Sequence, residues 1–167
     1  MSNQLLNITE EASEVMIADA LNAFPNECCG FFYGSENENE RIITIAKPVV
    51  NSKEGDQRRR FEISPFDYMK AEQFALQNGL LLLGVYHSHP NHPSVASIHD
   101  LAKAMPYFSY VIISVMKGKL NTVQSWRLKE DVREFEEEKV NIYKIQGARS
   151  IESGIVPQIA SVSETKY

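Results

Sequence analysis

The chain has 167 residues, 43% of them hydrophobic and 23% charged, which is ordinary for a soluble globular protein and suits one domain with a sizeable core. Its net charge of −5 argues against general nucleic-acid binding. The first residues lack the basic and apolar regions of a secretory signal, and the apolar run at 80–86 is too short to span a bilayer. The only cysteines, Cys28 and Cys29, are adjacent and therefore poorly placed for a structural disulfide, which predicts a reducing cytoplasm.

The first half of the chain predicts a helix, two strands and a second helix. Residues 8–24 form the first helix, with Thr9 as N-cap and with Val15, Ala18 and Leu21 spaced to share one side. Residues 28–34 and 41–50 read as strands joined by a polar turn, and a charged loop at 51–60 leads to the end of another strand at 61–63. The second helix begins at Ser64-Pro65, a cap followed by proline, and ends at Asn78-Gly79.

The second half continues with a buried strand at 80–86, followed by His87-Ser88-His89. A third helix is expected over 98–105, ended by Pro106, and then strands at 110–115 and 120–128. Residues 135–140 could be an edge strand or a short helix. We expect one domain at 1–145 and a C-terminal tail at 146–167 that is flexible or orders only on a partner.

The stretch around His87 predicts a metal site. Residues i and i+2 of a strand share a face, so His87 and His89 can reach one point at the end of the strand, while Ser88 points away. Pro90 and Pro93 then stop the strand, and a tight loop returns Asp100. Two imidazoles and one carboxylate make a plausible zinc site with a fourth position open for water.

A structural explanation also exists for part of this pattern, because Ser97-x-x-Asp100 before a helix is a capping signature. All four histidines of the chain lie between His87 and His99, however, and a polar pair at the end of a buried strand would bring no structural benefit. We therefore favour metal binding, and Ser97 can cap the helix while Asp100 binds the metal. The sequence leaves exposed and supporting roles equally open for His92 and His99.

The pattern His87-x-His89-Pro90, six residues, Ser97, two residues and Asp100 resembles the JAMM (MPN-plus) metalloprotease motif. That family also uses an upstream glutamate, and residues 25–30, PNECCG, match the P-x-E-x-C-G form of its bacterial and archaeal members. The resemblance covers residues 8–128. It implies an α/β fold, a three-layer α/β/α arrangement with a mixed β-sheet of the MPN/JAMM and cytidine-deaminase-like type.

The resemblance also implies the chemistry. One Zn²⁺ per chain would be held by His87, His89 and Asp100, Glu27 would be the general base and Ser97 would donate a hydrogen bond to the developing oxyanion. From the residues alone, Glu27 would be read as a solvated loop carboxylate. The cluster Arg58, Arg59 and Arg60 is by default a solvated edge, and contact with a carboxylate-bearing partner is the alternative.

The implied reaction is hydrolysis of an amide or isopeptide bond after the C-terminal Gly-Gly of a ubiquitin-like protein. Because the chain is short, we rank processing of a sulfur-carrier-type protein, including release of an amino acid such as cysteine, above cleavage of ubiquitin-like conjugates. A non-catalytic MPN scaffold is the alternative from a different class, and it is disfavoured because Glu27 and the metal motif are all present. No membrane or nucleic-acid partner is expected, and the sequence does not specify the carrier, the leaving group or the oligomeric state.

Overall fold

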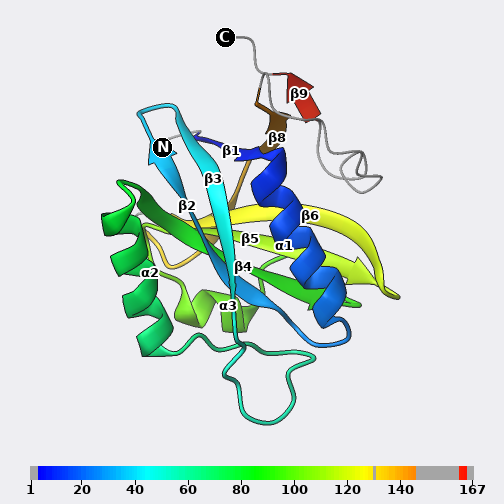
Figure 1. Ribbon diagram of the computed structural model, residues 1–167. Helices are drawn as coiled ribbons and strands as arrows, with labels where there is room; N and C mark the ends of the chain where they lie inside the picture. The colour runs from blue at the N-terminus through cyan, green and yellow to red at the C-terminus, as the bar shows by residue number, and fades with distance from the viewer. Residues whose placement is uncertain (1–3, 130, 146–161, 165–167) are drawn as a thin grey trace.

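The computed structural model describes residues 4–129, 131–145 and 162–164 (Figure 1). Three helices and nine strands make up this part of the chain. In chain order they are β1 (Leu5–Thr9), α1 (Glu10–Ala23), β2 (Cys29–Glu36), β3 (Glu40–Val49), α2 (Pro65–Gln77), β4 (Leu81–Pro90), α3 (Ile98–Lys103), β5 (Ser109–Met116), β6 (Lys119–Leu128), β7 (Phe135–Glu138), β8 (Val140–Lys144) and β9 (Val162–Glu164).

The described strands form one mixed sheet in the order β7-β6-β5-β4-β2-β3-β1-β8-β9. The pairs β4–β5, β1–β3, β1–β8 and β8–β9 are parallel, and the others are antiparallel. The strand β4 therefore lies inside the sheet, between β2 and β5, where both of its faces are covered. No helix within this part of the chain is both long and apolar enough to cross a membrane.

Helices cover both faces of the sheet, which gives three layers (Figure 1). The strand β2 shows the reason, because its apolar side chains alternate between two cores. Phe32 packs in the core beneath α1, whereas Phe31 and Tyr33 pack in the core beneath α2 and α3. The predicted three-layer α/β/α fold with a mixed sheet is confirmed.

The N-cap of α1 is predicted correctly, but the start of the helix and the side that packs on the sheet are not. Thr9 accepts a hydrogen bond from the amide of Ala12 at 3.2 Å, as expected of an N-cap, but residues 5–9 form β1 rather than the first turn. Val15 is 38% exposed, and Ala18 is exposed too. The side that packs on the sheet is formed by Ala12, Met16, Ile17 and Ala20, and of the predicted stripe only Leu21 packs against it.

Two other boundaries differ from the prediction. Residues 61–63 belong to the loop before α2 and form no strand. The helix α3 ends at Lys103, before Pro106, because Ala104 is extended at its C-cap. His87 and His89 lie on the strand itself, as predicted, because β4 continues as far as Pro90.

At the C-terminal end of the domain, the edge-strand alternative for residues 135–140 is confirmed by β7, which pairs with β6 at one edge of the sheet. The strand β8 is an additional finding. Residues 162–164 form β9 beside β8, and the rest of the predicted tail lies outside the described residues. The division into a domain at 1–145 and a tail at 146–167 stays a prediction.

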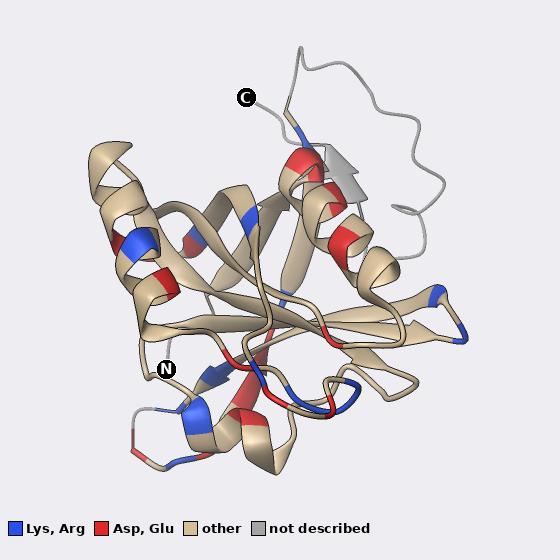
Figure 2. Cartoon of the chain, turned by 60° about the horizontal axis from the view of Figure 1, so that its bottom comes forward, with Lys and Arg blue, Asp and Glu red and all other residues tan. Residues whose placement is uncertain are grey.

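The loop that joins β3 to α2 lies at the bottom of the view in Figure 1, near α3. We call residues 50–64 the basic loop, since it carries Arg58, Arg59 and Arg60. Figure 2 shows that Lys and Arg alternate with Asp and Glu along this loop, whereas α1 bears only acidic residues among its charged ones. Positive and negative side chains are therefore mixed along the basic loop, and they do not form one basic face.

Candidate metal centre and active site

His87, His89 and Asp100 meet at one point, as the sequence predicts. The Nε2 atoms of His87 and His89 lie 3.2 Å apart. Asp100 reaches them from α3, with Oδ1 3.1 Å from His87 Nε2 and Oδ2 3.4 Å from His89 Nε2. All three side chains are almost completely buried, so the cluster is screened from solvent.

These separations fit a zinc ion. In tetrahedral coordination with bonds of about 2.0 to 2.1 Å, neighbouring ligand atoms lie roughly 3.3 Å apart. The three distances in the structure, 3.1, 3.2 and 3.4 Å, match this value. Nitrogen and carboxylate donors are also the types that zinc prefers, and a set of two histidines and one aspartate leaves a fourth position for catalysis.

The surroundings of the two rings fix how they face this point. His89 Nδ1 lies 2.7 Å from the carbonyl oxygen of Pro93, so Nδ1 carries the proton that it donates and Nε2 keeps its lone pair. The His87 ring stacks on Phe61, with ring centroids 4.5 Å apart and an interplanar angle of 25°. Phe61 belongs to the basic loop, which thus forms one wall of the metal site.

The electrostatics of His87 and Asp100 suit metal ligands, whereas burial, which would lower the pKa of His89, is outweighed by its hydrogen bonds to Asp100 and Pro93, which raise that pKa. Burial lowers the pKa of His87, which favours the neutral imidazole that can bind a cation. Burial alone would raise the pKa of Asp100, but His87 and His89 outweigh it and hold that pKa well below its usual range. A neutral imidazole and an ionised carboxylate are the states in which these side chains bind metal.

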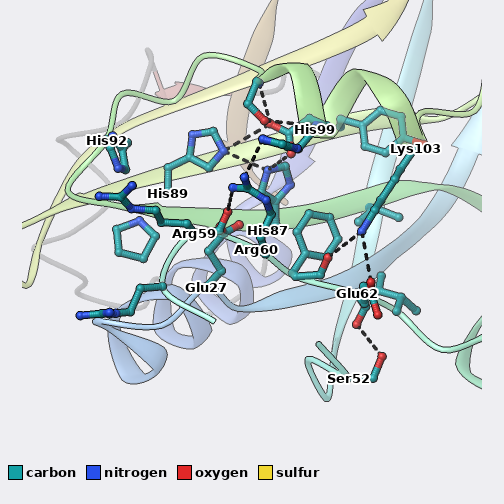
Figure 3. Close-up of a pocket in the computed structure, with 18 of the residues that line it drawn as sticks. Glu27, Ser52, Arg59, Arg60, Glu62, His87, His89, His92, His99 and Lys103 are labelled. Carbon is teal, nitrogen blue, oxygen red and sulfur yellow. Dashed lines mark hydrogen bonds and ion pairs between the residues drawn. The ribbon is translucent and has the colours of Figure 1, made fainter. Parts of the chain in front are cut away.

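Glu27 faces the same cluster from the turn before β2 (Figure 3). A ligand-capable atom from each of Glu27, His87 and His89 lies within 4.8 Å of the other two. Asp100 is not in that triplet, yet it contacts both rings within 3.4 Å and is therefore well placed to join His87 and His89 in holding a metal. Burial raises the pKa of Glu27 to about 8, which allows it to take up and release a proton near neutral pH.

The backbone of Glu27 is held by the basic loop. Its amide donates to the carbonyl oxygen of Gln57 at 2.7 Å, and its carbonyl oxygen accepts from Nδ2 of Asn51 at 3.2 Å. On the other side of the turn, the Cys28 amide donates to Ser88 Oγ at 2.8 Å. The prediction that Ser88 faces away from the metal cluster is therefore confirmed, and its hydroxyl braces the segment that carries Glu27.

Ser97 is the N-cap of α3, and the capping box predicted from the sequence is present. Its Oγ accepts from the Asp100 amide at 3.1 Å, and its own amide donates to Asp100 Oδ2 at 2.7 Å. The cap thus fixes the Asp100 carboxylate toward the histidines. Because the hydroxyl only accepts in this contact, its proton is free to be donated elsewhere.

One cleft of about 860 Å³ is lined by Glu27, His87, His89, Ser97 and Asp100, together with Phe61, His92, His99 and the three arginines of the basic loop (Figure 3). The arginines differ in their partners. Arg58 forms an exposed ion pair with Asp56 at 3.0 Å, whereas Arg60 donates from Nη2 to His99 Nε2 at 2.6 Å. His92 contributes no atom to the metal cluster.

Sequence reasoning missed the residues that support the site. These are Asn51, which acts through its side-chain amide, Gln57, which acts through its backbone carbonyl, and Phe61, which acts through the face of its ring. Such contacts leave no periodic pattern in a sequence. The only available signal was Asn51 itself, since asparagine after a strand often caps the loop that follows.

A mixed three-layer α/β domain presents here a His-His-Asp cluster that could hold a metal and a facing glutamate that could serve as a base. A family model described as prokaryotic homologs of the JAB domain matches residues 9–129. The chain therefore belongs to this family, and the resemblance found in the sequence is confirmed.

Two curated relatives, both named desampylase, are similar to the chain. The one from Pyrococcus furiosus is 33% identical over 75 residues, which are 45% of this chain and 49% of that protein. The one from Haloferax volcanii is 28% identical over 119 residues, 68% of this chain and 84% of that protein. The alignment thus spans only about half of the first relative's length.

Two solved structures share the fold. A solution structure from Desulfitobacterium hafniense has a TM-score of 0.73 at 28% identity and covers 85% of this chain and 95% of its own. Another, from Salinibacter ruber, has a TM-score of 0.62 at 31% identity and covers 88% of this chain and 96% of its own.

Proposed function

We propose that the protein is a zinc-dependent hydrolase that cleaves the amide bond after the C-terminal Gly-Gly of a ubiquitin-like, sulfur-carrier-type protein. One observation carries the proposal: His87, His89 and Asp100 converge at zinc-ligand distances in a cleft that Glu27 also faces. Membership of the JAB family supports it. The name of the two relatives is consistent with hydrolytic removal of a ubiquitin-like modifier.

In this proposal His87, His89 and Asp100 hold the ion, which when bound supplies Lewis acidity for hydrolysis. Glu27 takes a proton from the attacking water and delivers it to the leaving amine, a dual task that suits its pKa of about 8. Ser97 donates its free hydroxyl proton to the oxygen that becomes negative at the scissile carbonyl. The two unpaired cysteines are consistent with work in the cytoplasm.

The burial of His87, His89 and Asp100 limits the shape of the substrate that can reach them. A scissile carbonyl must approach side chains that are almost completely buried, so the residues before it need to be narrow and extended. Glycine allows this approach because it has no side chain to clash. A Gly-Gly tail therefore suits the cleft better than an internal loop of a folded protein.

The test uses a ubiquitin-like protein ending in Gly-Gly and extended by one residue, incubated with the zinc-loaded protein and analysed by mass spectrometry. We expect cleavage after the second Gly, strong slowing when that Gly is replaced by Val, and loss of about 10² to 10⁴ in rate in Glu27→Gln. Efficient cutting at unrelated internal loops would indicate a general peptidase instead.

A second candidate is an isopeptidase that removes a ubiquitin-like modifier from a lysine side chain, which the name of the relatives favours. The same assay with an isopeptide-linked conjugate compares the two substrates directly. A non-catalytic scaffold would show neither bound zinc nor turnover.

A further inference from the structure

Arg60 lies beside the proposed catalytic residues, and its guanidinium has N–H donors that no other residue described in the structure uses. Its Nη2 donates to His99 Nε2 at 2.6 Å and its Nη1 donates to the Arg59 carbonyl at 2.7 Å. A guanidinium has five N–H donors, so these contacts leave others for a ligand. Among the residues that the structure describes, no carboxylate lies within ion-pair distance of Arg60.

Figure 3 shows where this guanidinium lies. Glu27, Arg60, His87 and His99 are gathered at the centre of the cleft, whereas Lys103 and Glu62 lie to one side and His92 to the other. The charge of Arg60 acts on the Glu27 carboxyl, whose pKa it helps to lower against the larger opposing effect of burial. The position of Arg60 beside Glu27 and its contact with His99 place its cation in the reaction centre, whereas Lys103, which has the same effect on Glu27, lies to one side.

A single side chain fixes Arg60 relative to Glu27. The Asn51 Nδ2 group donates to the carbonyl oxygen of Glu27 at 3.2 Å and to that of Arg60 at 3.1 Å. The Oδ1 atom of the same amide accepts from the backbone amides of Lys53 and Glu62 at 3.0 and 3.1 Å. The backbones of Glu27 and Arg60 are thus tied to one point of the basic loop.

We propose that Arg60 binds the free α-carboxylate of the leaving residue, so that the preferred substrate carries one amino acid after Gly-Gly. The inference rests on the proposed function, because it needs Glu27 to deliver a proton to the leaving amine. In an amino acid the amine nitrogen and the carboxylate carbon are only about 2.5 Å apart. The carboxylate must therefore lie close to Glu27, where an uncompensated negative charge would be repelled.

Arginine suits this task because its planar fork binds a carboxylate through two parallel hydrogen bonds. A lysine side chain as leaving group brings no carboxylate to this position, and a longer extension replaces the carboxylate with a neutral amide. Arg60 thus favours a one-residue extension over both. Arg58 cannot substitute for it, since it is 67% exposed and already paired with Asp56.

The reaction needs only water as co-reactant. The bond between the second glycine's carbonyl carbon and the leaving nitrogen breaks, and the oxygen of water bonds to that carbon. One proton of water passes through Glu27 to the amine. The products are a carrier that ends in the glycine carboxylate and a free amino acid.

The test compares three forms of one ubiquitin-like carrier ending in Gly-Gly, extended by alanine as the free acid, by alaninamide and by Ala-Ala. We expect the zinc-loaded wild type to cleave the free acid about tenfold or more faster in kcat/KM than the other two, the scale of a charge-assisted hydrogen-bonded pair. Arg60→Gln should abolish the preference by slowing the free acid alone, Arg60→Lys should restore part of it, and Arg58→Gln should retain it.

Equal rates on all three forms with the wild type would overturn the proposal. So would an Arg60→Gln variant that slows all three equally, a result that would instead assign Arg60 to contact with the body of the carrier. If no form is cut, the proposed function fails for this carrier, and binding then tests Arg60 separately. Zinc-loaded Glu27→Gln should bind acetyl-Gly-Gly-Ala about tenfold more tightly than its amide, and adding Arg60→Gln should equalise the two; equal affinities before that change would refute the subsite.

Discussion

Replacing Asn51 with alanine would remove four hydrogen bonds while leaving every proposed metal ligand in place. Two run from Nδ2 to the carbonyls of Glu27 and Arg60, at 3.2 and 3.1 Å. Two are accepted by Oδ1 from the amides of Lys53 and Glu62, at 3.0 and 3.1 Å. The substitution therefore separates the placement of the general base from the binding of the metal.

The expected loss of stability follows from this count. A hydrogen bond contributes about 1 kcal/mol net, and some of the freed groups can bind water because the site is only partly buried. We expect a decrease of about 2 to 4 kcal/mol in the free energy of unfolding. In a chain of this size, that corresponds to roughly 4 to 16 °C in Tm.

We expect Asn51→Ala to lose activity even under conditions in which the variant is fully folded. Without Asn51 the Glu27 peptide keeps its bond to the Gln57 carbonyl but loses the one on its other side. We expect kcat to fall about tenfold or more at a temperature where the variant is folded, since a misplaced general base forfeits part of a contribution of about 10² to 10⁴. The zinc content, measured by mass spectrometry or atomic absorption, should stay at one per chain.

Ser52→Ala is the matched control. Ser52 is the next residue and its hydroxyl makes one exposed hydrogen bond, to the Glu62 carbonyl at 3.0 Å. It should cost about 1 kcal/mol or less and leave kcat unchanged. An Asn51→Ala protein that loses stability but keeps kcat within twofold of the wild type would refute the positioning role.

Five further substitutions test the proposed metal centre and the sheet. His89→Ala should lose the zinc, whereas His92→Ala should keep it because His92 stands outside the cluster; tightly bound zinc in the former would contradict the ligand assignment. Burial raises the pKa of Glu138 above its ordinary value of 4.5, so wild-type stability should fall as the pH rises from about 4.5 through the folded-state pKa. Glu138→Gln should flatten this dependence in urea unfolding measured across pH, and an unchanged slope would exclude Glu138 as its source. Gly84→Ala should unfold the protein or cost several kcal/mol, because a Cβ would overlap the Ser109 carbonyl and the Phe32 ring; Gly79→Ala, with open space at φ +64°, should cost only about 1 to 2 kcal/mol by thermal unfolding.

The parts of the fold that sequence predicted correctly are those with local causes. Ser64 and Pro65 place the start of α2 because a capping hydroxyl and a proline both suit a first helical turn, and the Ser64 side chain accepts from the Asp67 amide as expected. Alternation along a strand places His87 and His89 on one face without any knowledge of the partner strands. The return of Asp100 to them was expected from the two prolines and the short loop, and the family resemblance supported it, although the path of residues 91–97 itself could not be predicted.

The parts that were missed depend on distant partners. The strand β1 is five residues long and continues directly into α1, so its sequence looks like the beginning of the helix. It forms a strand because it lies between β3 and β8, where Leu6 is opposite both Arg41 and Val140. Parallel pairing between segments more than 130 residues apart leaves no signal in either segment alone.

The buried side of α1 was missed for a related reason. Helical spacing allows several apolar stripes, and the chosen one contains Val15, which is partly exposed. The side that packs on the sheet carries Met16 and Ile17, each 2% exposed. Which stripe is buried depends on how the helix rotates against the sheet, and that is decided by packing rather than by periodicity.

The same long-range pairing positions the two halves of the candidate active site. Cys29 is opposite His87 in the antiparallel pair of β2 and β4, so the residue two positions after Glu27 is in register with the first ligand. Ser88 strengthens this register, because its Oγ accepts from the Cys28 amide at 2.8 Å and its amide donates to the Cys28 carbonyl at 3.2 Å. A slip of one residue would turn both histidines toward α1 and leave Ser88 facing the cleft. A fully buried serine between the ligands therefore does what an apolar residue could not, since it ties the segment bearing the general base to the strand bearing the metal ligands.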